Sequence, residues 1–146
     1  MASYLELREA LRSELVSKLS VSVSNHNGSF SEQDSKNLSL NPGDEVLLAM
    51  DAVNQNSARF RIYIKTRNSG SHSADVRALG LILQVQKILQ VWKHKLIAKR
   101  ISSTWEQLPD NILADMNVYI YRVSAELPIY QEDYLEDYLE EKSNGN

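Results

Sequence analysis

Residues 60–92, FRIYIKTRNSGSHSADVRALGLILQVQKILQVW, contain in order one strand, one polar loop and one long helix. Hydrophobic side chains alternate along the strand, which is the period of a half-buried strand; they are Phe60, Ile62 and Ile64. The next residues are too small and polar to pack, and Ser73 is a suitable N-cap for a helix that extends to about residue 96. This unit is typical of an α+β domain.

The segments on either side complete the predicted fold. A helix is expected over residues 3–19, where Leu7, Leu11 and Leu15 recur on one helical face. The apolar run 45–53 and the strand 59–67 predict a hairpin, and residues 116–125 alternate again as a third strand. The predicted fold is therefore α+β: a small mixed or antiparallel sheet, with an N-terminal helix and one long central helix packed on one face.

The 146 residues are expected to form one α+β domain over residues 1–130, followed by an acidic C-terminal tail over residues 131–146. Within the domain, residues 20–41 are rich in serine and asparagine and are predicted to be a long polar loop, in which Val21 and Val23 alternate with serines and could form a short edge strand. From Glu126 onward the chain has seven acidic residues against Lys142 alone, whereas the preceding part has 15 basic and 12 acidic residues. The prediction is a mildly basic body with an acidic tail.

Several classes of function lack the residues they need. The chain has no cysteine, and its three histidines are scattered, so no metal ligand is assigned. It also lacks the motifs of a nucleophile elbow, a phosphate-binding loop and a dinucleotide site. No apolar run approaches the roughly 20 residues of a membrane span. We therefore expect no catalytic residue, no cofactor, no membrane contact and no enzymatic activity.

The second face of the central strand is strongly basic. Its members are interface candidates: Arg59, Arg61, Tyr63, Lys65 and Arg67. Such a face suits nucleic acid, because cations neutralise phosphates and an aromatic ring stacks on a base. Such a face is more often simply a solvated sheet face. A third interpretation is a surface that contacts an acidic patch on a neighbouring copy. The tail supplies such a patch, and its candidates are Glu132, Asp133, Glu136 and Asp137.

The central helix carries a wider apolar stripe than one sheet face would cover, and Trp92 at its end is a further interface candidate. Either the N-terminal helix packs on the flank of this stripe, or another subunit does.

The order of these elements resembles that of the tail-terminator (tail-completion) proteins of tailed bacteriophages. The matching segments are residues 4–19, residues 45–53 with 59–67, residues 73–96 and residues 116–125. Within them, IYIKTRNS at residues 62–69 is a strand that ends in Arg-Asn before a loop and a helix, and it is similar to the Mu-like prophage members.

The resemblance implies a structural virion protein that is assembled in the host cytoplasm. It implies a homo-oligomeric ring, of six copies by analogy, that caps the tail tube, stops its growth and joins it to the neck or head. The partners would be tail-tube and neck proteins, with possible proximity to DNA. The alternatives are a neck or head-completion protein, a small nucleic-acid-binding or regulatory domain, and a dimeric adaptor whose broad helix packs on its own copy.

Overall fold

The computed structural model describes residues 4–28, 30–53, 57–68, 73–91, 102–109, 117–128, 138–139 and 141–142. Its helices and strands follow one another along the chain as α1 (Tyr4–Lys18), β1 (Ser22–His26), α2 (Glu32–Leu40), β2 (Glu45–Val53), β3 (Ser57–Arg67), α3 (Ala74–Val91), β4 (Ser103–Gln107) and β5 (Val118–Pro128). This order confirms the α+β class, the N-terminal helix, the hairpin and the long helix.

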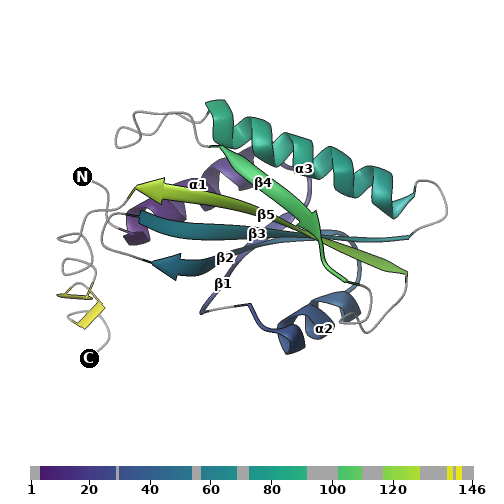
Figure 1. Ribbon diagram of the computed structural model, residues 1–146, viewed down its shortest axis with the longest axis horizontal. Coiled ribbons are helices and arrows are strands. Elements are labelled where there is room, and N and C mark those ends of the chain that lie inside the picture. The colour runs from purple at the N-terminus through teal and green to yellow at the C-terminus, as the bar shows by residue number, and fades with distance from the viewer. Residues whose placement is uncertain are drawn as a thin grey trace.

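Five strands form one mixed sheet in the order β1-β2-β3-β5-β4 (Figure 1). Only the β1–β2 pair is parallel, and the other three pairs are antiparallel. The β2–β3 hairpin has one irregularity in its register, between Met50 and Ala52. Since β5 inserts between β3 and β4, the central strand β3 is paired along its whole length on one side, from Ser57 opposite Pro128 to Arg67 opposite Val118.

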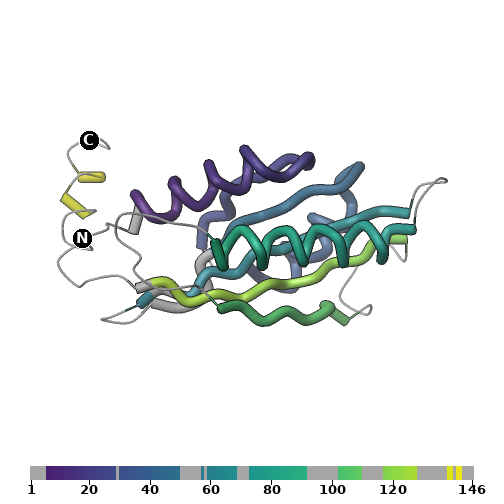
Figure 2. Tube along the Cα trace, turned by 90° about the horizontal axis from the view of Figure 1, so that it is seen from above, coloured from purple at the N-terminus to yellow at the C-terminus, as the bar shows by residue number. Residues whose placement is uncertain are grey.

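Helices α1 and α3 lie side by side on one face of the sheet, as both views show (Figures 1 and 2). Leu7, Leu11 and Leu15 of α1 are fully buried there, as their spacing of four predicts. They share one core with α3 and with the apolar face of β3, which contributes Phe60, Ile62 and Ile64. The prediction that the first helix packs beside the long helix on this face is therefore confirmed.

The long polar loop predicted at residues 20–41 is wrong, although the short edge strand suggested by Val21 and Val23 is present. Residues 22–26 form the edge strand β1, and α2 begins at a capping box in which the Ser31 side chain accepts from Asp34 N while Asp34 accepts from Ser31 N. This reciprocal cap stabilises a short helix with few apolar residues. One of them, Leu38, is buried against the opposite face of the sheet from α1 and α3.

The boundaries of the later elements differ from those expected. Helix α3 is described to Val91, and the end predicted at residue 96 lies outside the described residues. Strand β5 runs from Val118 through Pro128, two residues later at its start than predicted and three later at its end. Strand β4 was not predicted at all.

Candidate functional site

The five candidate residues of β3 share one sheet face, because the alternation of this strand is maintained throughout. They do not share one environment. Tyr63 is 2% exposed and Lys65 is fully buried, whereas Arg59 is exposed and Arg61 is half-buried. The five side chains therefore share a face but do not form one continuous surface, since the strand passes from solvent into a second core along its length.

Helix α2 and the segment before it cover the buried half of this face. The Phe30 ring stacks on Tyr63 with centroids 3.8 Å apart and planes 21° apart. Around them lies a second cluster of buried residues: Leu38, Ala49, Tyr63, Leu108, Val118 and Ile120. Tyr63 is therefore a core residue and is not available to stack on a base.

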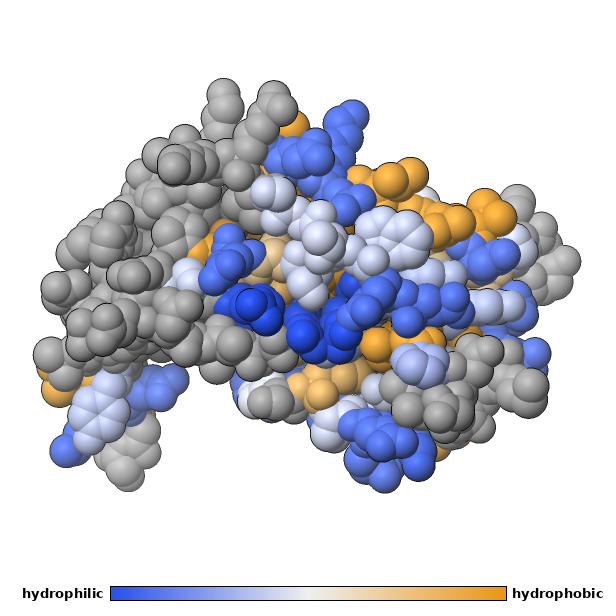
Figure 3. Space-filling model, viewed as in Figure 1, coloured by the Kyte–Doolittle hydropathy of each residue, from blue (hydrophilic) through white to orange (hydrophobic). Residues whose placement is uncertain are grey.

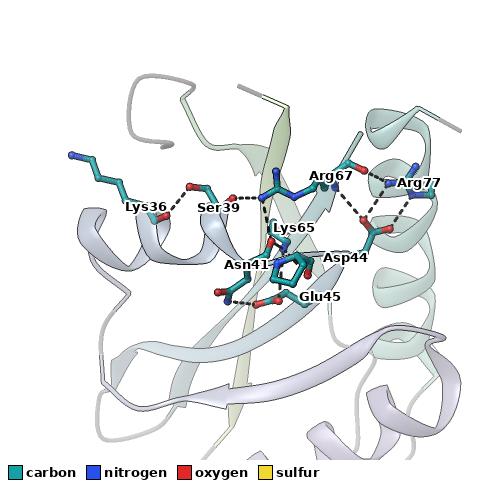
Figure 4. Close-up of polar contacts among 9 residues, drawn as sticks. Lys36, Ser39, Asn41, Asp44, Glu45, Lys65, Arg67 and Arg77 are labelled. Atoms are coloured by element: carbon teal, nitrogen blue, oxygen red, sulfur yellow. Dashed lines mark hydrogen bonds and ion pairs between the residues drawn. The ribbon is translucent and has the colours of Figure 1, made fainter. Parts of the chain in front are cut away.

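The Lys65 side chain binds the turn that precedes β2 (Figure 4). Its Nζ donates to the carbonyl oxygens of Asn41, at 2.6 Å, and Pro42, at 3.5 Å, and lies 3.7 Å from a Glu45 oxygen. Burial lowers the pKa of Lys65, and the nearby Glu45 carboxylate only partly compensates. A buried ammonium group held this way stabilises the turn and cannot contact a phosphate from outside.

Arg67 and Arg77 hold the same turn from its other side. Arg67 Nη2 donates to the carbonyls of Ser39, at 2.6 Å, and Asn41, at 3.2 Å. Arg77 of α3 binds both oxygens of Asp44, at 2.9 and 3.2 Å, and also donates to the Arg67 carbonyl. We call Asp44, Lys65, Arg67 and Arg77 the turn clamp, because together they join the turn to β3 and α3 (Figure 4).

The Asp44 carboxylate is the charge centre of the turn clamp. Burial opposes its ionisation, but hydrogen bonds from Arg77 and from the Arg67 amide outweigh burial, so the pKa of Asp44 lies below its ordinary value. The same pair raises the pKa of Arg77. All four charged groups are engaged within the fold, which makes the turn clamp structural.

Arg59 and Arg61 lie at the opposite end of the same sheet face. They line an open pocket of about 440 Å³, which we call the arginine pocket; its other residues are Ser102, Ser103, Thr104, Ser124, Ala125 and Glu126. Glu126, opposite Arg59 in the strand register, accepts a hydrogen bond of 2.6 Å from the Ser57 hydroxyl. The arginine pocket thus brings two guanidinium groups, one carboxylate and several hydroxyl groups together at the open end of the strand.

A second surface lies on the outer side of α3. Val76, Leu79 and Leu83 follow one another at helical spacing and are 64%, 40% and 65% exposed. We call these three residues the apolar stripe, and hydrophobic side chains gather along α3 in Figure 3. The broad apolar face predicted for this helix is thus only partly covered by the sheet and α1.

Trp105 of β4 adds to the exposed apolar surface beside α3. It pairs in register with Val123, a residue of the core under α1 and α3, so it lies on the same sheet face as α3. Its ring is 5.9 Å from that of Tyr121, and the residue is 44% exposed. Sequence reasoning did not predict β4, because the strand has only five residues and Trp105 is its one large apolar side chain.

Five of the predicted interface candidates lie outside the described residues: Trp92, Glu132, Asp133, Glu136 and Asp137. Within the acidic tail, the structure describes Tyr138, Leu139, Glu141 and Lys142, all of which are helical.

Across the described ranges, no group of three or more histidine, aspartate or glutamate side chains comes together to hold a metal ion. None of the helices in the same ranges combines the length and hydrophobicity that a membrane crossing requires.

No family model matches the chain, and no curated protein matches it. Among solved structures the chain is similar to full-length ShkA in complex with AMPPNP, at 9% sequence identity and a TM-score of 0.31. The matched region covers 85% of this chain and 28% of that one. A similarity at this TM-score supports no argument about fold or function.

Proposed function

We propose that this chain is the structural subunit of a ring, a tail terminator that caps a bacteriophage tail tube and joins it to the neck or head. The observation that carries the proposal is the apolar stripe of α3 beside the outer strand β4. Exposed apolar surface next to a sheet edge is typical of a surface that another protein covers. The occupant we propose is a second copy of the chain.

Two unlike sheet edges support assembly between copies. Among the described residues, β4 pairs only with β5 and β1 pairs only with β2, so the sheet ends in two different edges. If the β4 side of one copy packs on the β1 side of the next, the contact is heterologous. Repetition of a heterologous contact generates a ring when the rotation closes. Such a ring has two different faces, as a cap between a tube and a neck requires.

The order of elements supports the tail-terminator family within this class. Helix α1, the β2–β3 hairpin, the long α3 and the final strand β5 follow in the order that the resemblance implies. A ring of six copies is proposed by analogy with that family. A neck or head-completion protein remains the alternative within the same class.

A nucleic-acid-binding domain is the second candidate, and the arginine pocket is the observation that favours it. This candidate is weaker, because Tyr63, Lys65 and Arg67 are engaged inside the fold and only Arg59 and Arg61 line the pocket. Two phosphate contacts would give weak binding with only a shallow dependence on salt.

A matched pair of substitutions tests the ring. Leu83 in the apolar stripe is 65% exposed and Leu40 at the end of α2 is 64% exposed. We expect Leu83→Lys to weaken self-association about tenfold or more, because it places a charge in the proposed contact, and Leu40→Lys to leave it unchanged. Native mass spectrometry across a concentration series measures both. A wild-type chain that is monomeric at every concentration and in assembled particles would contradict the proposal.

A further inference from the structure

We propose that the apolar stripe of one copy packs into a groove beside Gly80 on α3 of the next copy. This inference rests on the proposed function, and it names the surface that receives the apolar stripe. The observations behind it are the shape of the groove, the open space at Gly80 and the positions of the groove and the stripe on different flanks of α3.

The groove lies on the flank of α3 that faces the start of β1. Its volume is about 280 Å³, and four of its lining residues belong to α3: Arg77, Gly80, Leu81 and Gln84. Their spacing of i, i+3, i+4 and i+7 is that of the four-residue hole into which a facing helix inserts one side chain. Ser20 and Val21, which precede β1, and Asp44 complete the lining. We call this surface the glycine groove.

Gly80 keeps the glycine groove open. Glycine is less favourable than alanine in the middle of a helix, and Gly80 is exposed there. Apart from the backbone of α3 itself, no described atom lies within 4 Å of the position that a Cβ of residue 80 would occupy. Packing among the described residues therefore gives no reason for glycine at this position. The close approach of a second helix gives one, because glycine leaves room for it.

The lining of the glycine groove suits an apolar side chain. Leu81 belongs to the core and is 7% exposed, and Val21 packs against the same core. The two charged residues of the lining bind each other, since Arg77 donates to both oxygens of Asp44. A leucine that enters the groove therefore gains apolar contact and leaves this ion pair intact.

The apolar stripe lies on another flank of the same helix. Leu79 and Leu83 precede Gln86 by seven and three residues, so the three residues face the same side of α3. Gln86 donates from Nε2 to the carbonyl oxygen of Ser103 in β4, at 3.2 Å, which places this flank toward β4. Figure 2 shows α1 on one side of α3 and β4 on the other.

Two different flanks make the contact directional. The stripe of one copy occupies the groove of the next, and that copy still presents its own stripe on its β4 side. Such a contact is heterologous and repeats from copy to copy. It also joins the β4 side of one copy to the β1 side of the next, as the proposed ring requires.

One substitution fills the glycine groove. Gly80→Leu places a side chain in the open space and replaces glycine by a better helix former, so we expect a higher Tm for the dilute chain. The same substitution should weaken self-association at least tenfold, because it occupies the acceptor surface. The matched control, Ser13→Leu at an exposed position of α1, should leave self-association unchanged. Thermal denaturation measures the first effect, and native mass spectrometry across a concentration series measures the second.

A mixing experiment tests whether the stripe and the groove are partners. The Leu83→Lys chain keeps its groove, and the Gly80→Leu chain keeps its stripe. Each should fail to associate alone, whereas an equimolar mixture should form one-to-one dimers that bind about as tightly as wild-type copies and do not grow further. A mixture that stays monomeric would overturn the pairing of these two surfaces.

The remaining outcomes distinguish this inference from the ring itself. If Gly80→Leu associates like wild type while Leu83→Lys does not, the glycine groove is not the acceptor and the ring proposal stands. If neither substitution weakens association, both proposals fail. A wild-type chain that is monomeric at every concentration would also overturn the inference.

Discussion

The two ends of β3 carry the same kind of residues on the same sheet face and have opposite environments. At one end, Lys65 and Arg67 are bound within the fold by the turn before β2 and by α2. At the other end, Arg59 and Arg61 line an open pocket beside β4 and the end of β5. Basic residues on one strand face therefore do not necessarily form one surface. Each arginine or lysine acquires its role from whichever element packs above it.

Of the substitutions on this strand, we expect one at Lys65 to have the largest effect on the free energy of unfolding. Lys65→Ala removes a fully buried side chain and leaves the Asn41 carbonyl without its charged donor. We expect a loss of about 3 kcal/mol in the free energy of unfolding, from the cavity and from the lost charged hydrogen bond. Urea denaturation at neutral pH measures it. A loss no larger than that of a surface substitution would show that Lys65 is not part of the core.

An intermediate effect is expected at Asp44, at the centre of the turn clamp. Asp44→Asn should lower the free energy of unfolding by about 1–2 kcal/mol at neutral pH, because it weakens two hydrogen bonds from Arg77.

The effect of Asp44→Asn should depend on pH. The pKa of Asp44 is lowered in the folded chain from an ordinary value of 3.8. The stability it contributes is therefore fully present above pH about 4, and is lost as the pH falls through the lowered folded pKa. Denaturation curves at neutral and acidic pH should show wild type and variant converging in acid. A difference that is constant across pH would contradict an electrostatic role for Asp44.

The smallest effect is expected at the open end of the strand. Arg59→Ala should change the free energy of unfolding by no more than about 0.5 kcal/mol, because the residue is exposed on the sheet. The same urea denaturation applies, with Lys65→Ala as the comparison. If Arg59→Ala costs as much as Lys65→Ala, the two ends of the strand are equivalent and the comparison fails.

Much of the fold follows from local patterns in the chain. The leucines of α1 and the alternation of Phe60, Ile62 and Ile64 each allow only one arrangement of their buried face, since helices and strands have different side-chain periods. The hairpin and the long helix follow in the same way. The capping box at Ser31 and Asp34 was also a local signal, and α2 could have been predicted from it.

The sequence indicated which residues belong to the candidate site, but it did not indicate how they are arranged in space. The alternation of β3 correctly placed five candidates on one face. It carried no information about the stacking of Phe30 on Tyr63, because those residues are far apart in sequence. The alternation of β3 also gave no information about β4, a strand of five residues whose only described sheet partner is β5. The arginine pocket needs all of β3, β4 and β5, so no single segment indicates it.

By itself, the sequence determined that the segments of α1, β2, β3, α3 and β5 form helices and strands, and which face of β3 is apolar, because backbone period and side-chain hydrophobicity are local properties. Only the tertiary structure decided which basic residues meet solvent. Burial depends on contacts between distant segments: Leu38 of α2 and Asn41 of the following turn cover one end of the β3 face, and they leave Arg59 and Arg61 beside the end of β5. Desolvation and hydrogen bonding act on positions in space, and basic side chains on one strand face can therefore be buried, as Lys65 is, or exposed, as Arg59 is.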